Sequence, residues 1–172
     1  MLSARSEASR STVQDLSAVS ILVVDDDPDM RSLIRSALMH CRCENIMLSG
    51  KARDALQLFG TSKIDLVILD WMMRPMSGCE FLRELRRPER AIGAPVIVLS
   101  AGSEPRDVAM AHQFIISGWL TKPIALPELI YQISSVLALP TEKFTGEPDF
   151  AADVERLTER YPSKLADDLR LL

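Results

Sequence analysis

Short runs of apolar residues alternate along this chain with longer segments in which apolar residues recur every three or four positions. A short apolar run between polar residues is typical of a strand that is buried on both faces, and the wider spacing is typical of a helix with one buried face. The runs predict strands at 20–24, 43–48, 64–69, 95–99 and 118–121. The spaced patterns predict helices at 28–38, 52–59, 79–87, 105–116 and 126–139.

Strands and helices therefore alternate five times, which favours a sheet of parallel strands covered by helices on both faces. We predict an α/β domain over residues 20–139, with a flavodoxin-like, doubly wound parallel sheet of five strands and with five helices. In such a sheet, ligands bind at the edge where the strands reach their carboxyl ends.

The two ends of the chain differ in composition from this domain. Residues 1–19 are polar and lack an apolar core, so we expect a disordered lead and no secretory signal. Residues 140–149 contain Pro and Gly breaks and are interpreted as a linker. Residues 150–172 carry two apolar stripes at helical spacing, which predicts a C-terminal helical extension too short for a core of its own. We expect this extension to pack on the domain, to dock on a partner, or to pair two copies of the chain.

Composition narrows the classes of function. The 172 residues carry a net charge of -4, which disfavours direct DNA binding. No apolar run approaches the roughly 20 residues of a membrane span, so no membrane insertion is expected. Three cysteines without a secretory signal, Cys41, Cys43 and Cys79, indicate reduced thiols and a cytoplasmic location. Cys41 and Cys43 follow His40 and could suggest a metal site, but zinc spacing needs a second ligand pair, and a helix running into a strand explains them better.

Chemically useful residues follow four of the five predicted strands. They are Asp25 and Asp26 after the first strand, Asp70 after the third, Ser100 after the fourth and Lys122 after the fifth. If the strands are parallel, all five residues meet at one edge of the sheet. Three close carboxylates repel one another and need a cation, and oxygen ligands favour a hard ion such as Mg²⁺ or Mn²⁺. Taken singly, each residue also has a plain structural interpretation, such as helix capping by an acid or a solvated lysine.

This set resembles the receiver domain of two-component response regulators, of the chemotaxis type, over roughly residues 20–139. The resemblance is carried by four segments in order along the chain: Val24-Asp25-Asp26, Leu69-Asp70 with Gly78 eight residues on, Ser100-Ala101, and Lys122-Pro123. One acid pair alone would be unspecific, but an ordered set at four strand ends is specific. The resemblance implies a phosphorylation-dependent regulator that receives its phosphoryl group from a sensor histidine kinase or a histidine phosphotransfer protein.

The resemblance also implies a role for each residue at the acidic edge. Asp70 would be the phosphoacceptor, and Lys122 would pair with Asp70 and then with its phosphate. The cation would be held by Asp25 or Asp26, by Asp70 and by the backbone carbonyl of Met72. These interactions position and neutralise the phosphoryl group, which is most of what its transfer requires.

The remaining implied roles concern the signal. Ser100 and Trp119 would form the switch that senses the phosphate, and the peptide bond before Pro123 would be cis. The signal would pass by protein contacts to a downstream protein target, and the C-terminal extension would serve docking or a homodimer.

Two departures from the family pattern lie just after Asp70. Arg74 stands between Met73 and Pro75, where the family usually has the proline directly, so the loop is expected to run differently. Met72 occupies a position where a polar side chain can place the water that hydrolyses the phosphoryl group. Methionine cannot do so, which predicts a long-lived phosphoryl group or a loss that depends on a partner.

A third departure precedes the last strand, where Phe114, Ile115 and Ile116 replace a glycine-containing stretch. Without a glycine in this stretch, the preceding helix lacks the residue that most often caps a helix C-terminus. We expect an exposed apolar partner face made of Met110, Phe114, Ile115 and Trp119.

Two other functions fit parts of the pattern. A pseudo-receiver would keep the fold as a scaffold without ever being phosphorylated. A Mg²⁺-dependent phosphatase with an aspartyl nucleophile would need a second acid at Met72, so we do not expect an enzyme. The arginines between 83 and 90 alternate with glutamates, which predicts a solvated helix face.

Overall fold

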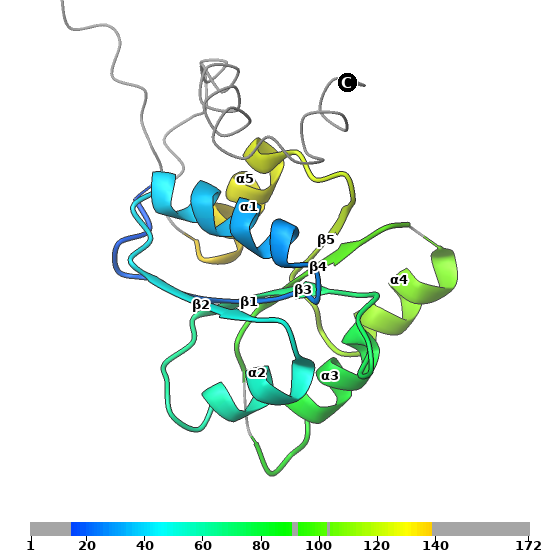
Figure 1. Cartoon of the computed structure of the whole chain (residues 1–172). Coiled ribbons are helices and arrows are strands. Elements are labelled where there is room, and N and C mark those ends of the chain that lie inside the picture. The colour runs from blue at the N-terminus through cyan, green and yellow to red at the C-terminus, as the bar shows by residue number, and fades with distance from the viewer. Residues whose placement is uncertain (1–14, 91–92, 103, 139–172) are drawn as a thin grey trace, which may run out of the picture. The chain divides into compact units, whose positions relative to one another are not determined.

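The computed structural model describes residues 15–90, 93–102 and 104–138 (Figure 1). The strands are β1 (Ser20–Val24), β2 (Asn45–Ser49), β3 (Leu66–Asp70), β4 (Val96–Ser100) and β5 (Gly118–Thr121). The helices are α1 (Pro28–His40), α2 (Ala52–Leu58), α3 (Gly78–Leu85), α4 (Pro105–His112) and α5 (Leu126–Val136). None of these described helices combines the length and the hydrophobicity that a membrane span requires. The expected linker (140–149) and helical extension (150–172) lie outside the described residues.

All five strands are parallel, in the order β2-β1-β3-β4-β5. Figure 1 shows α1 and α5 on one face of the sheet and α2 and α3 on the other. The predicted flavodoxin-like α/β fold is therefore confirmed. The central strand β3 is buried along its whole length because helices cover both of its faces.

Alternate residues of β3 enter different layers of the core. Leu66 and Ile68 pack with residues of α1 and α5, whereas Val67 and Leu69 pack with residues of α2 and α3. Side chains of a strand alternate between its faces, so one strand fills both layers. Asp70 is the last residue of β3 and stands where these apolar layers end.

Two helices that begin at this edge of the sheet carry side-chain caps. The Asp27 carboxylate accepts a hydrogen bond from the Asp29 N–H at 2.9 Å, and Pro28 occupies the first turn of α1. Ser77 and Glu80 form a reciprocal capping box at the start of α3. These caps fix where the loops after β1 and β3 turn into helices.

The sequence predicts a fourth helix that extends to residue 116, but α4 ends at His112. Ile115 then has a φ of 55°, in the left-handed region that favours glycine. Arg86, at the C-terminal end of α3, donates hydrogen bonds to the carbonyl oxygens of Phe114 (3.1 Å), Ile115 (3.4 Å) and Ala94 (3.0 Å). A guanidinium from another element therefore closes this turn, which helix periodicity does not reveal.

The prediction of disorder up to residue 19 is wrong for residues 15–19. Leu16 and Val19 are both buried in the core layer beneath α1 and α5. The Leu16 N–H also donates to the Cys41 carbonyl oxygen at 2.9 Å. The segment before β1 is thus fixed to the C-terminal end of α1.

Candidate functional site

Three carboxylates meet at the carboxyl edge of the sheet. They belong to Asp25, Asp26 and Asp70, and one oxygen of each lies within 4.8 Å of the others. They converge because β1 and β3 are neighbours that pair Val24 with Leu69. Asp25 and Asp70 are only 1% and 4% exposed, whereas Asp26 is exposed. Acids this close repel one another unless positive charge offsets them.

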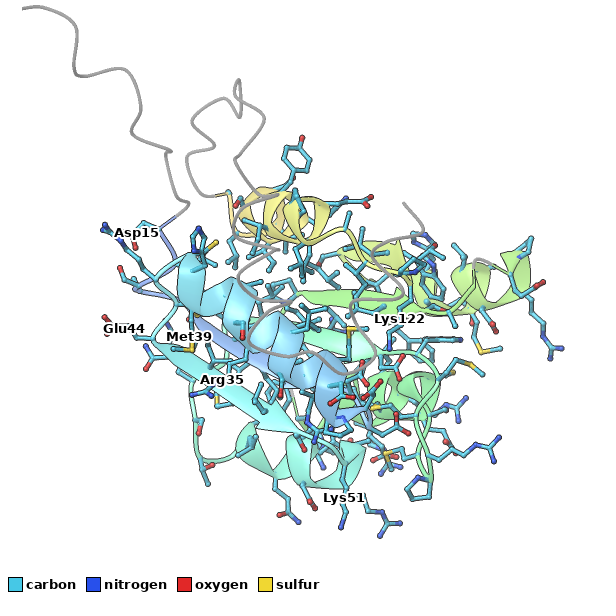
Figure 2. All side chains as sticks on the ribbon, turned by 45° about the horizontal axis from the view of Figure 1, so that its top comes forward. Asp15, Arg35, Met39, Glu44, Lys51 and Lys122 are labelled. Atoms are coloured by element: carbon cyan, nitrogen blue, oxygen red, sulfur yellow. The ribbon has the colours of Figure 1, made fainter. Side chains whose placement is uncertain are left out.

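One ammonium group contacts two of these acids. Lys122 Nζ lies 2.9 Å from an Asp25 oxygen and 3.1 Å from an Asp70 oxygen. Figure 2 shows Lys122 at the N-terminal end of α1 and Asp15 at the opposite end of that helix. Three carboxylates and one ammonium sum to a formal charge of -2 (three negative, one positive). This donor set fits a divalent cation with oxygen ligands.

Burial shapes the charge states of this cluster. Burial raises the pKa of Asp25 above its usual value, and the hydrogen bond from Lys122 opposes the shift only in part. Burial lowers the pKa of Lys122, but the hydrogen bond and charge of Asp25 outweigh it, so the pKa of Lys122 lies above its usual value. The two shifts show that burial disfavours the ionised form of Asp25, while the neighbouring acids keep Lys122 charged.

Asp25 is held through both its backbone and its side chain. Its N–H donates to the Ser49 carbonyl oxygen at 3.2 Å, and its own carbonyl oxygen accepts from Arg31 Nη1 at 2.6 Å. Its Oδ1 accepts from the Asp27 N–H at 2.9 Å. Sequence reasoning did not single out Arg31, because an arginine in the first turn of an amphipathic helix is usually solvated.

The loop after β3 returns to the acids through its backbone. The Arg74 N–H donates to Asp26 Oδ2 at 3.2 Å, and the Met72 N–H donates to Asp70 Oδ1 at 3.4 Å. The side chains of Met72 and Arg74 are exposed. The Arg74–Pro75 peptide bond is cis. Arg74 thus contributes its backbone N–H to the site.

Ser100 and Lys122 come from adjacent strand ends. Ser100 is buried at the end of β4, and its hydroxyl accepts from the Gly102 N–H at 3.3 Å. Its carbonyl oxygen accepts from the Lys122 N–H at 2.6 Å. The Lys122–Pro123 peptide bond is cis. The hydroxyl and the ammonium are therefore brought to the edge that carries Asp70.

Two tryptophans pack against each other beside the acids. Trp71 directly follows Asp70. The centroids of the Trp71 and Trp119 rings lie 5.4 Å apart, at an interplanar angle of 61°. This is an edge-to-face pair. Among the described residues, the buried Trp119 Nε1 has no hydrogen-bond partner. Sequence reasoning named Trp119 but missed Trp71, although its position next to Asp70 was a usable signal.

The expected partner face is smaller than the sequence suggested. Met110, Phe114 and Trp119 are partly buried against the core layer beneath α2 and α3. Ile115 is the member of the set that protrudes, with 81% of its surface exposed. Three of the four residues therefore contribute to the core, and Ile115 is the one that is mostly exposed.

Cys41 and Cys43 have the structural role that the sequence predicts, where a helix runs into a strand. Cys41 and Cys43 are both buried among apolar residues of the layer beneath α1 and α5. Burial raises the pKa of Cys41 to about 11. The thiolate is the form that binds metal, so this environment disfavours a metal site.

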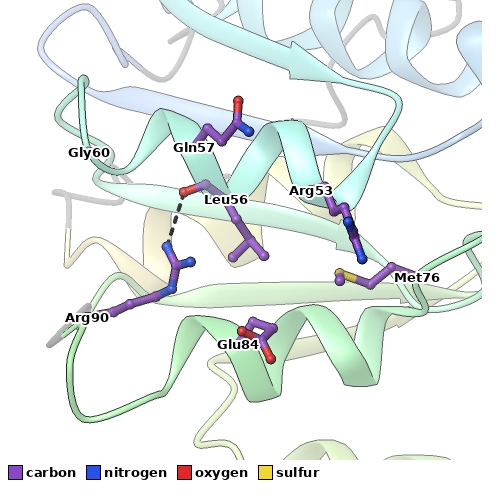
Figure 3. Close-up of a pocket in the computed structure, with 7 residues that line it drawn as sticks. All are labelled: Arg53, Leu56, Gln57, Gly60, Met76, Glu84 and Arg90. Carbon is purple, nitrogen blue, oxygen red and sulfur yellow. Dashed lines mark hydrogen bonds between the residues drawn. The ribbon is translucent and has the colours of Figure 1, made fainter.

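A separate groove of about 490 Å³ lies between α2 and α3 (Figure 3). It is lined by Arg53, Leu56, Gln57, Gly60, Met76, Glu84 and Arg90. Arg90 Nη1 donates to the Leu56 carbonyl oxygen at 3.4 Å, and Figure 3 shows Arg53 at the other end of the groove. None of the three clustered acids lines it, so the groove is not part of the candidate site.

Comparisons with known proteins agree with this geometry. The model of the response regulator receiver domain family matches residues 21–134. The phosphate regulon transcriptional regulatory protein PhoB of Pseudomonas aeruginosa is 31% identical over 136 residues, which are 79% of this chain and 57% of PhoB. The chemotaxis protein CheY of the same species is 28% identical over 118 residues, which are 69% of this chain and 95% of CheY. The chain thus spans little more than half of PhoB and nearly all of CheY.

A solved structure gives the same result for the fold. The receiver domain of the Francisella response regulator 1452 is 28% identical to this chain, with a TM-score of 0.64. The likeness covers 70% of this chain and 97% of the solved one. The similarity therefore extends over nearly the whole of a solved receiver domain.

Proposed function

This chain belongs to the response regulator receiver domain family, and we propose that it is a phosphorylation-dependent switch of two-component signalling that uses Asp70 as phosphoacceptor. Like CheY-type regulators, it is a signalling switch and not an enzyme that turns over a separate substrate. The observation that carries the proposal is the contact of Lys122 with both Asp25 and Asp70 inside the acidic cluster.

Asp70 is the proposed acceptor because it ends the central strand, lies in the acid cluster and contacts Lys122. One of its carboxylate oxygens attacks the phosphorus of a phosphohistidine. The new O–P bond forms as the P–N bond breaks, and the imidazole leaves. A carboxylate is already a nucleophile, so the chain needs no general base, and Lys122 offsets the charge of the incoming phosphate.

The proposed cation is Mg²⁺ or Mn²⁺, held by Asp25 or Asp26, by Asp70 and by the Met72 backbone carbonyl. When bound, such an ion neutralises charge on the transferring phosphoryl oxygens. One acid of the pair is buried and the other is exposed, which suits an ion that keeps several waters.

The proposed switch consists of Ser100 and Trp119. Ser100 would turn its hydroxyl from the Gly102 N–H to the new phosphate, as a donor of a charge-assisted hydrogen bond. Movement of Trp119 would follow, and its unpaired Nε1–H would gain from any position that offers an acceptor. Phosphorylation at the sheet edge would thus alter the surface near Ile115.

The proposed partners are a sensor histidine kinase or histidine phosphotransfer protein and a downstream protein target. We propose that residues 150–172 serve docking or a homodimer. Membership of a kinase-driven family and three free cysteines support action in the cytoplasm.

The test is phosphorylation by acetyl phosphate, followed by intact-protein mass spectrometry with Mg²⁺ or with a chelator. The expected result is a gain of one phosphoryl mass that needs Mg²⁺ and is lost in Asp70→Asn. Asp27→Asn is the matched control, because Asn also caps helices and Asp27 lies outside the acid cluster. No mass gain in the native chain would favour the scaffold, and turnover of phosphate esters would favour the phosphatase.

A further inference from the structure

Arg31 makes a contact with the acid loop that the proposed chemistry does not use. Its Nη1 donates to the backbone carbonyl oxygen of Asp25 at 2.6 Å. Within the described part of the chain, this carbonyl is the only hydrogen-bond or ion-pair partner of the guanidinium. Among these residues, Arg31 therefore acts on the backbone of the loop and pairs with no carboxylate.

Gly50, between β2 and α2, provides the space for this contact. A Cβ at Gly50 would lie 2.9 Å from Arg31 Nη1 and 3.2 Å from Arg31 Cζ. No described glycine has a positive φ, so space and not backbone conformation explains glycine at this position. The guanidinium lies against Gly50, and a Cβ at this position would force it to shift.

With the Arg31 contact, the N–H, the carboxylate and the carbonyl oxygen of Asp25 each have a hydrogen-bond partner. The Asp25 N–H is bound to the Ser49 carbonyl oxygen, and its carboxylate is bound by the Asp27 N–H and by Lys122. Only the carbonyl oxygen remains, and Arg31 holds it. The peptide group between Asp25 and Asp26 includes this oxygen, so the contact also sets the direction in which Asp26 leaves the strand.

We propose that Arg31 is a positioning residue of the cation site, which orients Asp25 and Asp26 through the Asp25 carbonyl and depends on the space at Gly50. The proposal rests on the proposed function, because the orientation matters only if the acids hold a cation. Groups that orient metal ligands in this indirect way typically change metal affinity about 10- to 100-fold when removed.

The charge of Arg31 predicts the opposite effect. A fixed positive charge close to a divalent ion repels it, so removal of the charge alone would tighten Mg²⁺ binding. Arg31→Met removes the charge and the hydrogen bond together. Gly50→Ala keeps the charge but displaces the guanidinium from the carbonyl. Positioning predicts weaker binding in both variants, whereas a charge effect predicts tighter binding in the first and little change in the second.

The experiment is a Mg²⁺ titration of the full chain, followed by the fluorescence of Trp71 and Trp119 beside the acids. We expect the dissociation constant to rise about 10-fold in Arg31→Met and in Gly50→Ala. Arg31→Lys keeps a charged donor group and should retain part of the affinity. Gly60→Ala is the control glycine substitution, because its Cβ would make only an ordinary contact at 3.5 Å, and it should bind as the native chain does.

A second measurement needs no metal. Amide hydrogen exchange of Asp25 and Asp27 in the metal-free chain should be faster in both variants, while amides of β3 keep their protection. A purely structural role would lower the melting temperature without changing the Mg²⁺ dissociation constant or this local exchange. If Arg31→Met or Gly50→Ala did not fold, the milder Arg31→Lys would decide by the same two measurements.

The outcomes separate this proposal from the one on which it rests. A native chain that binds no Mg²⁺ would overturn the cation site itself. A native chain that binds Mg²⁺, with variants of equal or higher affinity, would overturn the positioning role of Arg31 and leave the proposed function intact.

Discussion

The turn at Ile115 allows a stability prediction that does not depend on function. Ile115 is a β-branched residue with a φ of 55°. Left-handed conformations cost an L-residue roughly 1–2 kcal/mol, and strained sites cost up to about 3 kcal/mol. Replacing Ile115 by glycine removes this strain, because glycine adopts positive φ freely. The hydrogen bonds from Arg86 to this turn go to backbone carbonyls, so the substitution leaves them in place.

Two smaller effects oppose this gain. Glycine is freer in the unfolded chain, which costs about 0.5–1 kcal/mol. Ile115 is 81% exposed, so only about a fifth of the roughly 1.5–3 kcal/mol for full burial, or about 0.5 kcal/mol, is lost with the side chain. For strain of roughly 2–3 kcal/mol at this branched residue, Ile115→Gly should therefore stabilise the fold by about 1 kcal/mol.

Thermal and urea unfolding of the full chain measure this difference. A gain of about 1 kcal/mol corresponds to a rise of about 2–4 °C in melting temperature for a chain of this length. The neighbouring substitution Ile116→Gly is the control: Ile116 packs against the core and has no positive φ, so its loss should destabilise the fold. If Ile115→Gly were destabilising by a similar amount, the account of strain at this turn would be refuted.

Three further predictions follow from the same contacts. Arg86→Met should lower the free energy of unfolding by about 2 kcal/mol in a urea titration, because three carbonyl oxygens lose a charged donor; a loss below about 0.5 kcal/mol would contradict this. Burial raises the native pKa of Asp25 above its unfolded value of 3.8, so the ionised acid lowers stability above the native pKa. Asp25→Asn should then stabilise the metal-free fold at neutral pH, and the gain should disappear as the pH falls toward 3.8; a gain independent of pH would exclude this cause. Met72→Asn should speed phosphate loss severalfold after phosphorylation of Asp70, since a polar side chain can place the attacking water, and equal rates would rule the idea out.

The fold was predictable because each element buries a regular pattern. β1 and β5 begin and end where the apolar runs do, and β3 is the buried run that ends at Asp70. Convergence of the acids also followed from the sequence, since parallel strands place their carboxyl ends at one edge. The periodicity of apolar residues is enough to place the strands, and the parallel sheet is enough to place the acids at its carboxyl edge.

The remaining features depend on contacts between distant segments. The turn after α4 is bound by Arg86, which the interleaved charges predicted to be solvated but which is half-buried beneath this turn, 28 residues away. The role of Arg31 depends on the space at Gly50, another element's glycine. Leu16 is buried in a segment whose overall composition is polar. Composition and spacing do not show which backbone oxygen a long side chain reaches.

The unequal burial of the three cysteines also makes the chain suitable for site-selective labelling. Cys41 and Cys43 are shielded in the core, whereas Cys79 is partly exposed, near the start of α3 and 3.2 Å from the sulfur of Met110. A maleimide reagent under native conditions should therefore attach a single spin label or dye at Cys79. Such a probe would sit between α3 and α4 and would report the movement of one helix against the other without any engineered substitution.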